Sequence, residues 1–250
     1  MGWIQDFYKS QYSITKGMAD TITSYEEATV DKVEAISTVK GRLKILELGG
    51  GLGLFAVAAA KRGHDVTIIE LVPTAVEQIH NLALAHNVKD KMTIIEGDFY
   101  QVDLPNDFDI VCYWDGFGIG TDDDQKRLLH RIDNWLLPTG AVLVDIYTPW
   151  YWAKVSGQDM KIGADSHRQY GFDPKGCRML DTWWTTHSDK VAQSLRCYSP
   201  ADLNLLLSST SLSIQSLTPG GEMDYDKWIF TEKVPLERAM GFLAVLKKDE

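Results

Sequence analysis

The sequence of 250 residues predicts an α/β fold, in which a mostly parallel sheet carries helices on both faces. Short apolar segments typical of strands alternate with amphipathic helical patterns between positions 43 and 147. A glycine-rich turn joins the first of these strands to the helix that follows it. The length is enough for one α/β core, so we expect a single domain over residues 1–250.

The chain begins with two predicted helices. The first carries an aromatic and apolar stripe at helical spacing, which favours packing on the domain. This stripe consists of Trp3, Ile4, Phe7, Tyr8 and Tyr12. Thr23 and Glu26 form a capping box, which predicts a second helix that begins there and ends at Gly41.

The stretch that follows predicts a strand, a tight turn and a helix. Residues Leu43–Leu48 have the apolar character of a buried strand, and four glycines come directly after them. These are Gly49, Gly50, Gly51 and Gly53. Glycine suits a backbone that must turn sharply or lie close to a ligand, and the helix start offers free N–H groups and a positive dipole end. We therefore expect a nucleotide-like cofactor here.

The glycine spacing narrows the choice of cofactor. A dinucleotide fingerprint would need its third glycine at position 54, which is Leu54. A phosphate-binding P-loop is excluded because no Gly-Lys-Ser/Thr follows. The second predicted strand, Asp65–Leu71, contains Glu70 near its end, 19 positions after Gly51. An acidic side chain there can accept both ribose hydroxyls, which predicts an adenosine with a free 2′-hydroxyl.

At this point a family resemblance is visible. The segment Ile45–Gly53, with Glu47 before its first glycine, resembles motif I of the class I S-adenosylmethionine (SAM)-dependent methyltransferases. Glu70, Glu96–Phe99 and Asp109–Gly120 resemble the later motifs of that family, in the same order. The resemblance covers residues 43–144 well and the rest loosely. It implies a Rossmann-like, seven-stranded, mostly parallel sheet and SAM as cofactor.

The resemblance also implies roles for individual residues. Asp98 would accept a hydrogen bond from the adenine amino group, and Phe99 would line the adenine. Asp115 would face the amino group of the cofactor or the acceptor. Residues 1–40 would form an N-terminal helical lid. The predicted cofactor-binding residues are Tyr12, Glu47, Gly49, Gly50, Gly51, Gly53, Glu70, Leu71, Gly97, Asp98, Phe99, Trp114 and Asp115.

Further strands and helices complete the predicted sheet. Strands are expected at 92–96, 108–113, 141–147, 212–217 and 241–246, and the resemblance implies that the last is antiparallel and lies beside the sixth. Pro73 and the acidic run at 122–124 begin helices, and the second of these extends to Leu136. Pro138–Gly140 predicts a turn.

Residues 148–198 depart from this pattern and predict an inserted antiparallel cap over the substrate. Two strands are expected, Arg178–Thr186 and Lys190–Tyr198. The segment holds Trp150, Trp152, Trp183 and Trp184, half of the eight tryptophans of the chain. Such a cluster suits a local core or the wall of a pocket for an aromatic or cationic acceptor.

Methyl transfer requires an acceptor lone pair, and a general base can remove the proton. The candidate bases in the expected region are His167, His187, Tyr147, Tyr170 and Asp115, and the sequence does not choose among them. It contains no carboxylate set typical of a catechol-type Mg²⁺ site, so we expect no metal.

Composition limits the partners. The net charge of −10 argues against a nucleic-acid substrate, which requires clustered basic residues. The sequence shows no apolar run of membrane-spanning length and no signal peptide, and its three scattered cysteines fit a reducing compartment, so we expect a cytoplasmic protein. An exposed edge of the inserted strands could pair with a second copy.

The main hypothesis is transfer of a methyl group to an N, O or C atom of a small molecule. A nicotinamide-dependent oxidoreductase is an alternative, although the missing glycine at position 54 counts against it. A non-catalytic SAM-binding protein is a second alternative. Protein or nucleic-acid substrates are disfavoured by the acidic charge and by the insert, which suits an enclosed pocket.

Overall fold

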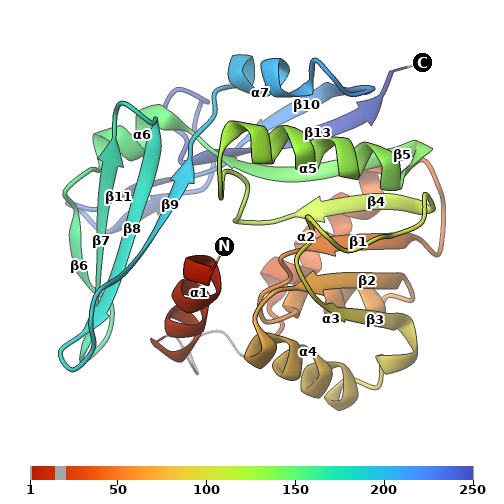
Figure 1. The fold of residues 1–250 in the computed structure, drawn as a ribbon, viewed down its shortest axis with the longest axis horizontal. Coiled ribbons are helices and arrows are strands. Elements are labelled where there is room, and N and C mark those ends of the chain that lie inside the picture. Colours follow the sequence, from red (N-terminus) through yellow and green to blue (C-terminus); the bar gives the residue numbers. More distant parts are fainter. Residues whose placement is uncertain (1, 15–20, 250) are drawn as a thin grey trace.

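Seven strands form the central sheet in the order β10-β13-β5-β4-β1-β2-β3 (Figure 1). The computed structural model describes residues 2–14 and 21–249. The strands are β1 (Lys44–Leu48), β2 (Asp65–Glu70), β3 (Met92–Glu96), β4 (Phe108–Tyr113), β5 (Leu136–Tyr147), β10 (Leu212–Pro219) and β13 (Gly241–Lys248). Strands β1 to β5 pair in parallel, whereas β13 runs antiparallel to both β5 and β10. The predicted Rossmann-like sheet and its antiparallel last strand are confirmed.

Helices cover both faces of this sheet. One apolar core lies between the sheet and the helices α2 (Ser24–Ile36), α3 (Leu54–Lys61) and α4 (Pro73–Ala85). The other lies beneath α5 (Asp122–Trp135) and α7 (Pro200–Leu207), which cross the sheet on the near side in Figure 1. The short 3-10 helix η1 (Lys89–Lys91) precedes β3. Strand alternation supplies both cores, because neighbouring residues point to opposite faces.

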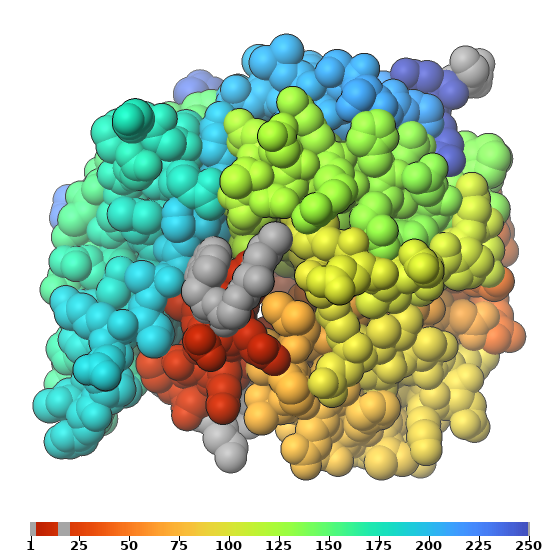
Figure 2. Space-filling view, viewed as in Figure 1, coloured from red at the N-terminus to blue at the C-terminus, as the bar shows by residue number. Residues whose placement is uncertain are grey.

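The cap is a separate four-stranded antiparallel sheet in the order β6-β7-β8-β9. Its strands are β6 (Asp159–Lys161), β7 (Ser166–Asp173), β8 (Arg178–Thr185) and β9 (Val191–Arg196), after the short helix α6 (Pro149–Lys154). The hairpin of β11 (Glu222–Asp224) and β12 (Ile229–Thr231) follows later in the chain. Helix α1 (Gly2–Ile14) lies between the cap and the central sheet (Figures 1 and 2).

The structure differs from the expected elements in several places, and helix α6 and the β11–β12 hairpin were not expected at all. The cap has four strands where two were expected, because β6 and β7 lack the apolar alternation that marks a strand. Helix α2 ends at Ile36 and not near Gly41, since the Ser37 hydroxyl accepts the Val39 N–H and forms a turn. Helix α5 ends at Trp135. Residues 136–140, expected to finish a helix and to turn, are an irregular start of β5 with a register shift against β4.

Only part of the N-terminal segment can be compared with the prediction. Helix α1 and the Thr23–Glu26 capping box are present. Residues 1 and 15–20, and the side chain of Trp3, lie outside the described residues. Helix α2 packs beside α3 on the sheet, so within the described part of residues 1–40 it is α1 that lies against the cap. Pairing of two copies and cytoplasmic localisation stay predictions.

Across residues 2–14 and 21–249, none of the helices combines the length and the apolar character needed to cross a membrane.

A buried ion pair holds the inner face of the cap together. The Arg168 guanidinium donates from Nε and Nη2 to both carboxylate oxygens of Asp181, each at 2.8 Å. Asp181 is fully buried, and Gln193 donates to it from the next strand at 3.3 Å. The guanidinium carbon of Arg168 lies 4.6 and 4.5 Å from the ring centres of Tyr170 and Trp183. This network fixes three neighbouring strands relative to one another.

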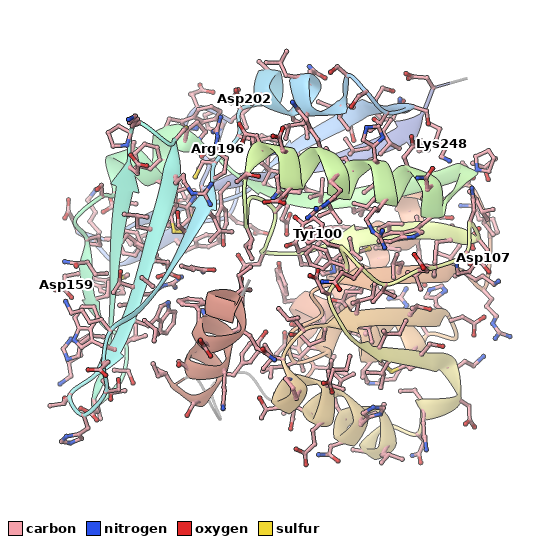
Figure 3. The ribbon with its side chains drawn as sticks, viewed as in Figure 1. Tyr100, Asp107, Asp159, Arg196, Asp202 and Lys248 are labelled. Atoms are coloured by element: carbon pink, nitrogen blue, oxygen red, sulfur yellow. The ribbon has the colours of Figure 1, made fainter. Side chains whose placement is uncertain are left out.

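We expect Asp181→Ala to lower the free energy of unfolding by about 3 kcal/mol, because Arg168 would keep its charge and lose its partner. Asp159→Ala is the matched control, since that carboxylate is exposed at the outer edge of the same sheet (Figure 3). Urea unfolding followed by tryptophan fluorescence measures both variants. Equal midpoints for the two variants would show that the ion pair contributes nothing to the stability of the cap.

Candidate functional site

A cavity of about 290 Å³ opens at the carboxyl ends of β1, β2, β3 and β4, where open α/β sheets bind ligands. Helix α1 contributes one of its walls. Every predicted cofactor-binding residue lines this cavity except Gly53. The structure therefore brings together residues from five separate segments of the sequence. Their roles in binding stay predictions.

The glycine turn requires glycine for two different reasons. Gly49, Gly51 and Gly53 have φ angles of 61°, 55° and 76°, in the left-handed region that side chains disfavour. At Gly50 the constraint is space, because an added Cβ would lie 2.0 Å from Cδ1 of Ile68, which is fully buried. Gly53 precedes α3 and packs against Ile79. Gly53 therefore supports the glycine turn on the side facing Ile79 and does not line the cavity.

Glu70 connects the ends of β1 and β2. Its Oε2 accepts the Gly51 N–H at 2.9 Å, and its Oε1 accepts the Val72 N–H at 2.8 Å. Burial raises the pKa of this carboxyl, and the hydrogen bonds from Val72, Gly51 and Leu71 oppose the rise. Each carboxylate oxygen keeps a second lone pair. Glu70 can therefore accept hydrogen bonds from two adjacent hydroxyls of a ligand, as the sequence predicts for a ribose.

Glu47 is a buried carboxylate with an unused acceptor. The residue is 3% exposed, and its Oε2 has no hydrogen-bond partner among the described residues. Burial raises the pKa of the carboxyl well above its ordinary value, and the nearby Glu70 raises it further. Buried polar atoms without partners are rare and point to a missing donor. Glu47 therefore fits a ligand that brings a cationic or hydrogen-bonding group to the glycine turn.

The loop after β3 forms another wall. Asp98 accepts the Tyr100 N–H at 2.8 Å and a bond from Gln101 at 3.2 Å, so it also serves as a turn residue. Phe99 packs edge-on against Tyr113, with 5.5 Å between ring centres. Tyr100 of the same loop lies near α5 (Figure 3), where the guanidinium carbon of Arg127 is 4.6 Å from its ring centre. These rings provide a flat apolar wall for a base-like ligand.

The segment after β4 is held in place from both sides. The Tyr113 hydroxyl donates to the Gly116 carbonyl at 2.8 Å. The side chain of Gln125, 1% exposed on α5, accepts the Gly118 N–H and donates to the Ile119 carbonyl. An added Cβ at Gly118 would lie 2.2 Å from the Arg196 carbonyl, so glycine lets the cap strand approach closely. This segment joins the cavity to the cap.

Asp115 lies in this segment with its side chain open to the cavity. The Tyr147 hydroxyl donates a hydrogen bond to its Oδ1. The surrounding protein raises the pKa of Asp115 to about 7, chiefly by desolvation, while Arg168 opposes the rise. Asp145 and Asp181 add to it by repulsion. The carboxyl therefore gains and loses its proton near neutral pH, as a general base requires.

Helix α1 spans the gap between the central sheet and the cap. Gln5 donates to the Leu71 carbonyl at 3.4 Å on one side, and the Tyr8 hydroxyl donates to Gln193 of the cap at 3.1 Å on the other. Tyr12 approaches the glycine turn, since an added Cβ at Gly51 would lie 3.5 Å from its hydroxyl. The position of α1 suits the predicted lid.

Of the five candidate bases, all of which the structure describes, only Asp115 lines the cavity. His167 stacks on Trp184 within the cap, with ring centres 5.3 Å apart. His187 is exposed in the turn between β8 and β9. Tyr170 is buried against Trp152. The geometry thus separates Asp115, with Tyr147 bonded to it, from the other candidates.

Sequence reasoning missed several residues of this site. Tyr113 and Tyr8 were assigned to a strand and to an apolar stripe, and nothing in their spacing marked them as cavity residues. Asp145 lies within β5, close enough to Asp115 for their charges to interact. Strand β5 supplies apolar residues to the cores on both faces of the sheet, so a charged residue between Val144 and Ile146 was itself a signal in the sequence.

Residues 45–140 match the family model described as "Methyltransferase domain". Among curated proteins, the chain is 28% identical over 103 residues to protein arginine N-methyltransferase 1 of Chlamydomonas reinhardtii, covering 40% of this chain and 30% of the relative. It is 26% identical over 123 residues to L-tyrosine C(3)-methyltransferase of Streptomyces lavendulae, covering 48% and 33%. The chain spans about a third of the length of these relatives.

Among solved structures, an S-adenosylmethionine-dependent methyltransferase from Clostridium acetobutylicum superposes with a TM-score of 0.73. The superposition covers 97% of this chain and 98% of that one at 13% sequence identity. This likeness shows a shared fold over nearly the whole chain.

Asp145 provides a test of these electrostatics. Burial raises its pKa to about 6 from an ordinary value of 3.8, and Lys32 opposes the rise. Folding therefore favours the protonated acid, and ionised Asp145 destabilises the fold above pH 6. We expect Asp145→Asn to unfold at a higher temperature than the wild type at pH 8. The difference should shrink as the pH falls from 6 to 3.8.

The measurement is thermal unfolding by circular dichroism across this pH range. Asp103→Asn, at an exposed position of the β3–β4 loop, is the control and should show no such trend. A difference between Asp145→Asn and the wild type that does not change with pH would contradict the assignment.

Proposed function

We propose that this chain is a class I SAM-dependent methyltransferase and transfers a methyl group from SAM to a small-molecule acceptor. The observation that carries the proposal is the charge of the cavity. Its charged wall residues are Glu47, Glu70, Asp98 and Asp115, and no Lys, Arg or His stands among the described residues that line it. Such a wall suits a cation and repels phosphate.

The negative charge of the cavity wall favours SAM over a nicotinamide dinucleotide as the cofactor. A dinucleotide carries a pyrophosphate, which binds at helix N-termini and basic side chains and would here meet only carboxylates. The residues present fit SAM. Glu70 would hold the ribose hydroxyls, Phe99 and Asp98 the adenine, and Glu47 with the glycine turn the amino-acid part. Bound there, SAM supplies a methyl group on a positively charged sulfur.

The chain itself contributes position and exclusion of water. Holding two reactants in line removes much of the entropic barrier to a displacement. The bond from Tyr8 of α1 to Gln193 of the cap closes one side of the cavity. This enclosure supports a small acceptor over a protein segment, although one matching relative is named for protein arginine. The enclosure selects the acceptor by size, and the methylated atom can be N, O or C.

Glu70→Ala tests the proposal together with its cofactor. S-adenosylhomocysteine at 100 times its dissociation constant should stabilise the wild type by about 2.7 kcal/mol, roughly 5 to 10 °C in melting temperature, and NADH should not. Because Glu70 would accept charge-assisted bonds from two hydroxyls, the variant should bind at least about tenfold more weakly. Isothermal titration calorimetry gives the affinity.

Glu96→Ala is the matched control, because Glu96 is the register partner of Glu70 at the end of β3 but is exposed and outside the cavity. It should bind S-adenosylhomocysteine like the wild type. Stabilisation of the wild type by NADH alone would refute the proposal.

A further inference from the structure

The fold holds Asp115 in a backbone conformation that is uncommon for residues other than glycine. Its φ angle of 49° lies in the left-handed region, where a Cβ is disfavoured. Tyr113 and Gln125 fix the turn through their bonds to Gly116 and Gly118. Backbone strain of this kind concentrates at functional sites, where the surrounding structure must enforce it. Here the enforced conformation places a carboxylate on the cavity wall.

The two oxygens of this carboxylate differ. Oδ1 accepts the hydrogen bond from Tyr147, which comes from the end of β5. For Oδ2 we find no partner among residues 2–14 and 21–249. Tyr147 itself packs against Trp152 of α6, with ring centres 5.0 Å apart, so its hydroxyl is held in position. One oxygen is thus anchored and the other is available to a ligand.

The groups around Asp115 favour a positive ligand. The charges that act on it are Arg168, Asp145 and Asp181. Arg168 is already neutralised by its two-point ion pair with Asp181, which leaves an excess of negative charge. Tyr8, Tyr12 and Tyr113 also face this region, and burial raises the pKa of each phenol well above its ordinary value, so they stay neutral. Among the described residues that line the cavity, no Lys, Arg or His offsets these carboxylates.

We propose that Asp115, oriented by Tyr147, binds the amino group of the acceptor and is the catalytic base, so that the methylated substrate is a small amine. This inference rests on the proposed function and names its acceptor class. A carboxylate or phenolate acceptor would be repelled by the same wall. An amine arrives as an ammonium ion, which the wall attracts.

The chemistry balances without another reactant. The ammonium group gives one proton to Oδ2 of Asp115, leaving a neutral amine with a free lone pair and a neutral carboxyl. The nitrogen lone pair forms the new N–C bond, the C–S bond breaks, and its electron pair returns to sulfur. The product leaves as the methylated ammonium ion, and Asp115 releases its proton to water. Tyr147 is a positioning residue, because it acts through Asp115.

The experiment measures binding, so it does not depend on finding the natural acceptor. Protein saturated with S-adenosylhomocysteine is titrated calorimetrically with benzylamine, benzyl alcohol or benzoate, which share a shape and differ in charge. We expect benzylamine to bind at least about tenfold more tightly than the alcohol, through a charge-assisted hydrogen bond. Its affinity should rise about tenfold from pH 6 to pH 8, as Asp115 ionises with a pKa of about 7.

Three variants locate the effect. Asp115→Asn keeps the size of the side chain and should lose both the preference for the amine and its pH dependence. Tyr147→Phe should keep the preference and shift its midpoint to higher pH, because the hydrogen bond that favours the carboxylate is gone. A purely structural role of Tyr147 would leave the midpoint unchanged. Asp123→Asn, whose side chain is 94% exposed on α5, should match the wild type.

Each remaining outcome counts against the inference. Equal binding of the alcohol or benzoate, an amine preference that survives in Asp115→Asn, or binding of none of the three probes at millimolar concentration would overturn it. So would loss of S-adenosylhomocysteine binding in Asp115→Asn, which would place that residue in the cofactor site. Failure of the wild type to bind S-adenosylhomocysteine would instead refute the proposed function.

Discussion

The hydrogen bonds of Glu70 are the interaction on which the geometry of the site depends. They join the Gly51 amide, in the turn after β1, to the Val72 amide, in the turn after β2. Parallel strands place the ends of β1 and β2 side by side, but they do not fix the loops that follow. A buried carboxylate that accepts from both loops fixes them together. The same side chain remains on the cavity wall, so the group that shapes the site also takes part in it.

The cap depends on a comparable contact at the end of β4. Strand β9 approaches so closely that position 118 has no space for a Cβ, and Arg178 donates to the carbonyls of Gly118 and Gly120. The segment that carries Asp115 is thereby linked to the cap, while α1 contacts both the cap and the end of β2. The cavity is therefore lined by α1 and by the loops at the ends of β1 to β4, and the cap holds α1 and the loop after β4 in place from outside.

The sequence predicted correctly those parts of the structure that are determined by a local sequence pattern. Strand and helix periods gave the central sheet, and the spacing between the glycine turn and Glu70 located an acid at the end of β2. The family resemblance supplied the antiparallel last strand. Prediction failed where long-range packing decides. The sequence of β7 lacks the alternation of apolar and polar residues that marks a strand. The segment is a strand because β6 and β8 pair with it on both sides.

The contrast between local pattern and long-range packing also explains why the sequence could not choose among the candidate bases. His167, His187 and Tyr170 share the expected segment with residues of the cap core, and only the folding of the cap shows which side chains turn away from the cavity. Tyr147 and Asp115 are 32 residues apart, and their hydrogen bond exists because β4 and β5 are neighbours. Asp145 interrupts the apolar run of β5, but its effect on Asp115 could not be predicted from the sequence, because that effect depends on the packing of β4 beside β5.

Charge connects the stability of the fold with the selection of its ligands. Burial raises the pKa of Glu47, desolvation by the cavity wall raises that of Asp115, and repulsion from other carboxyls raises both. Ionising them therefore costs free energy in the folded protein, and a cation that enters the cavity recovers part of it. The ligand that gains most is one whose positive charge meets these carboxyls inside a low-dielectric enclosure. A sulfonium and an ammonium both meet this condition, whereas a pyrophosphate or a carboxylate does not. The carboxyls that are costly to ionise in the folded protein therefore also determine which ligands the cavity selects.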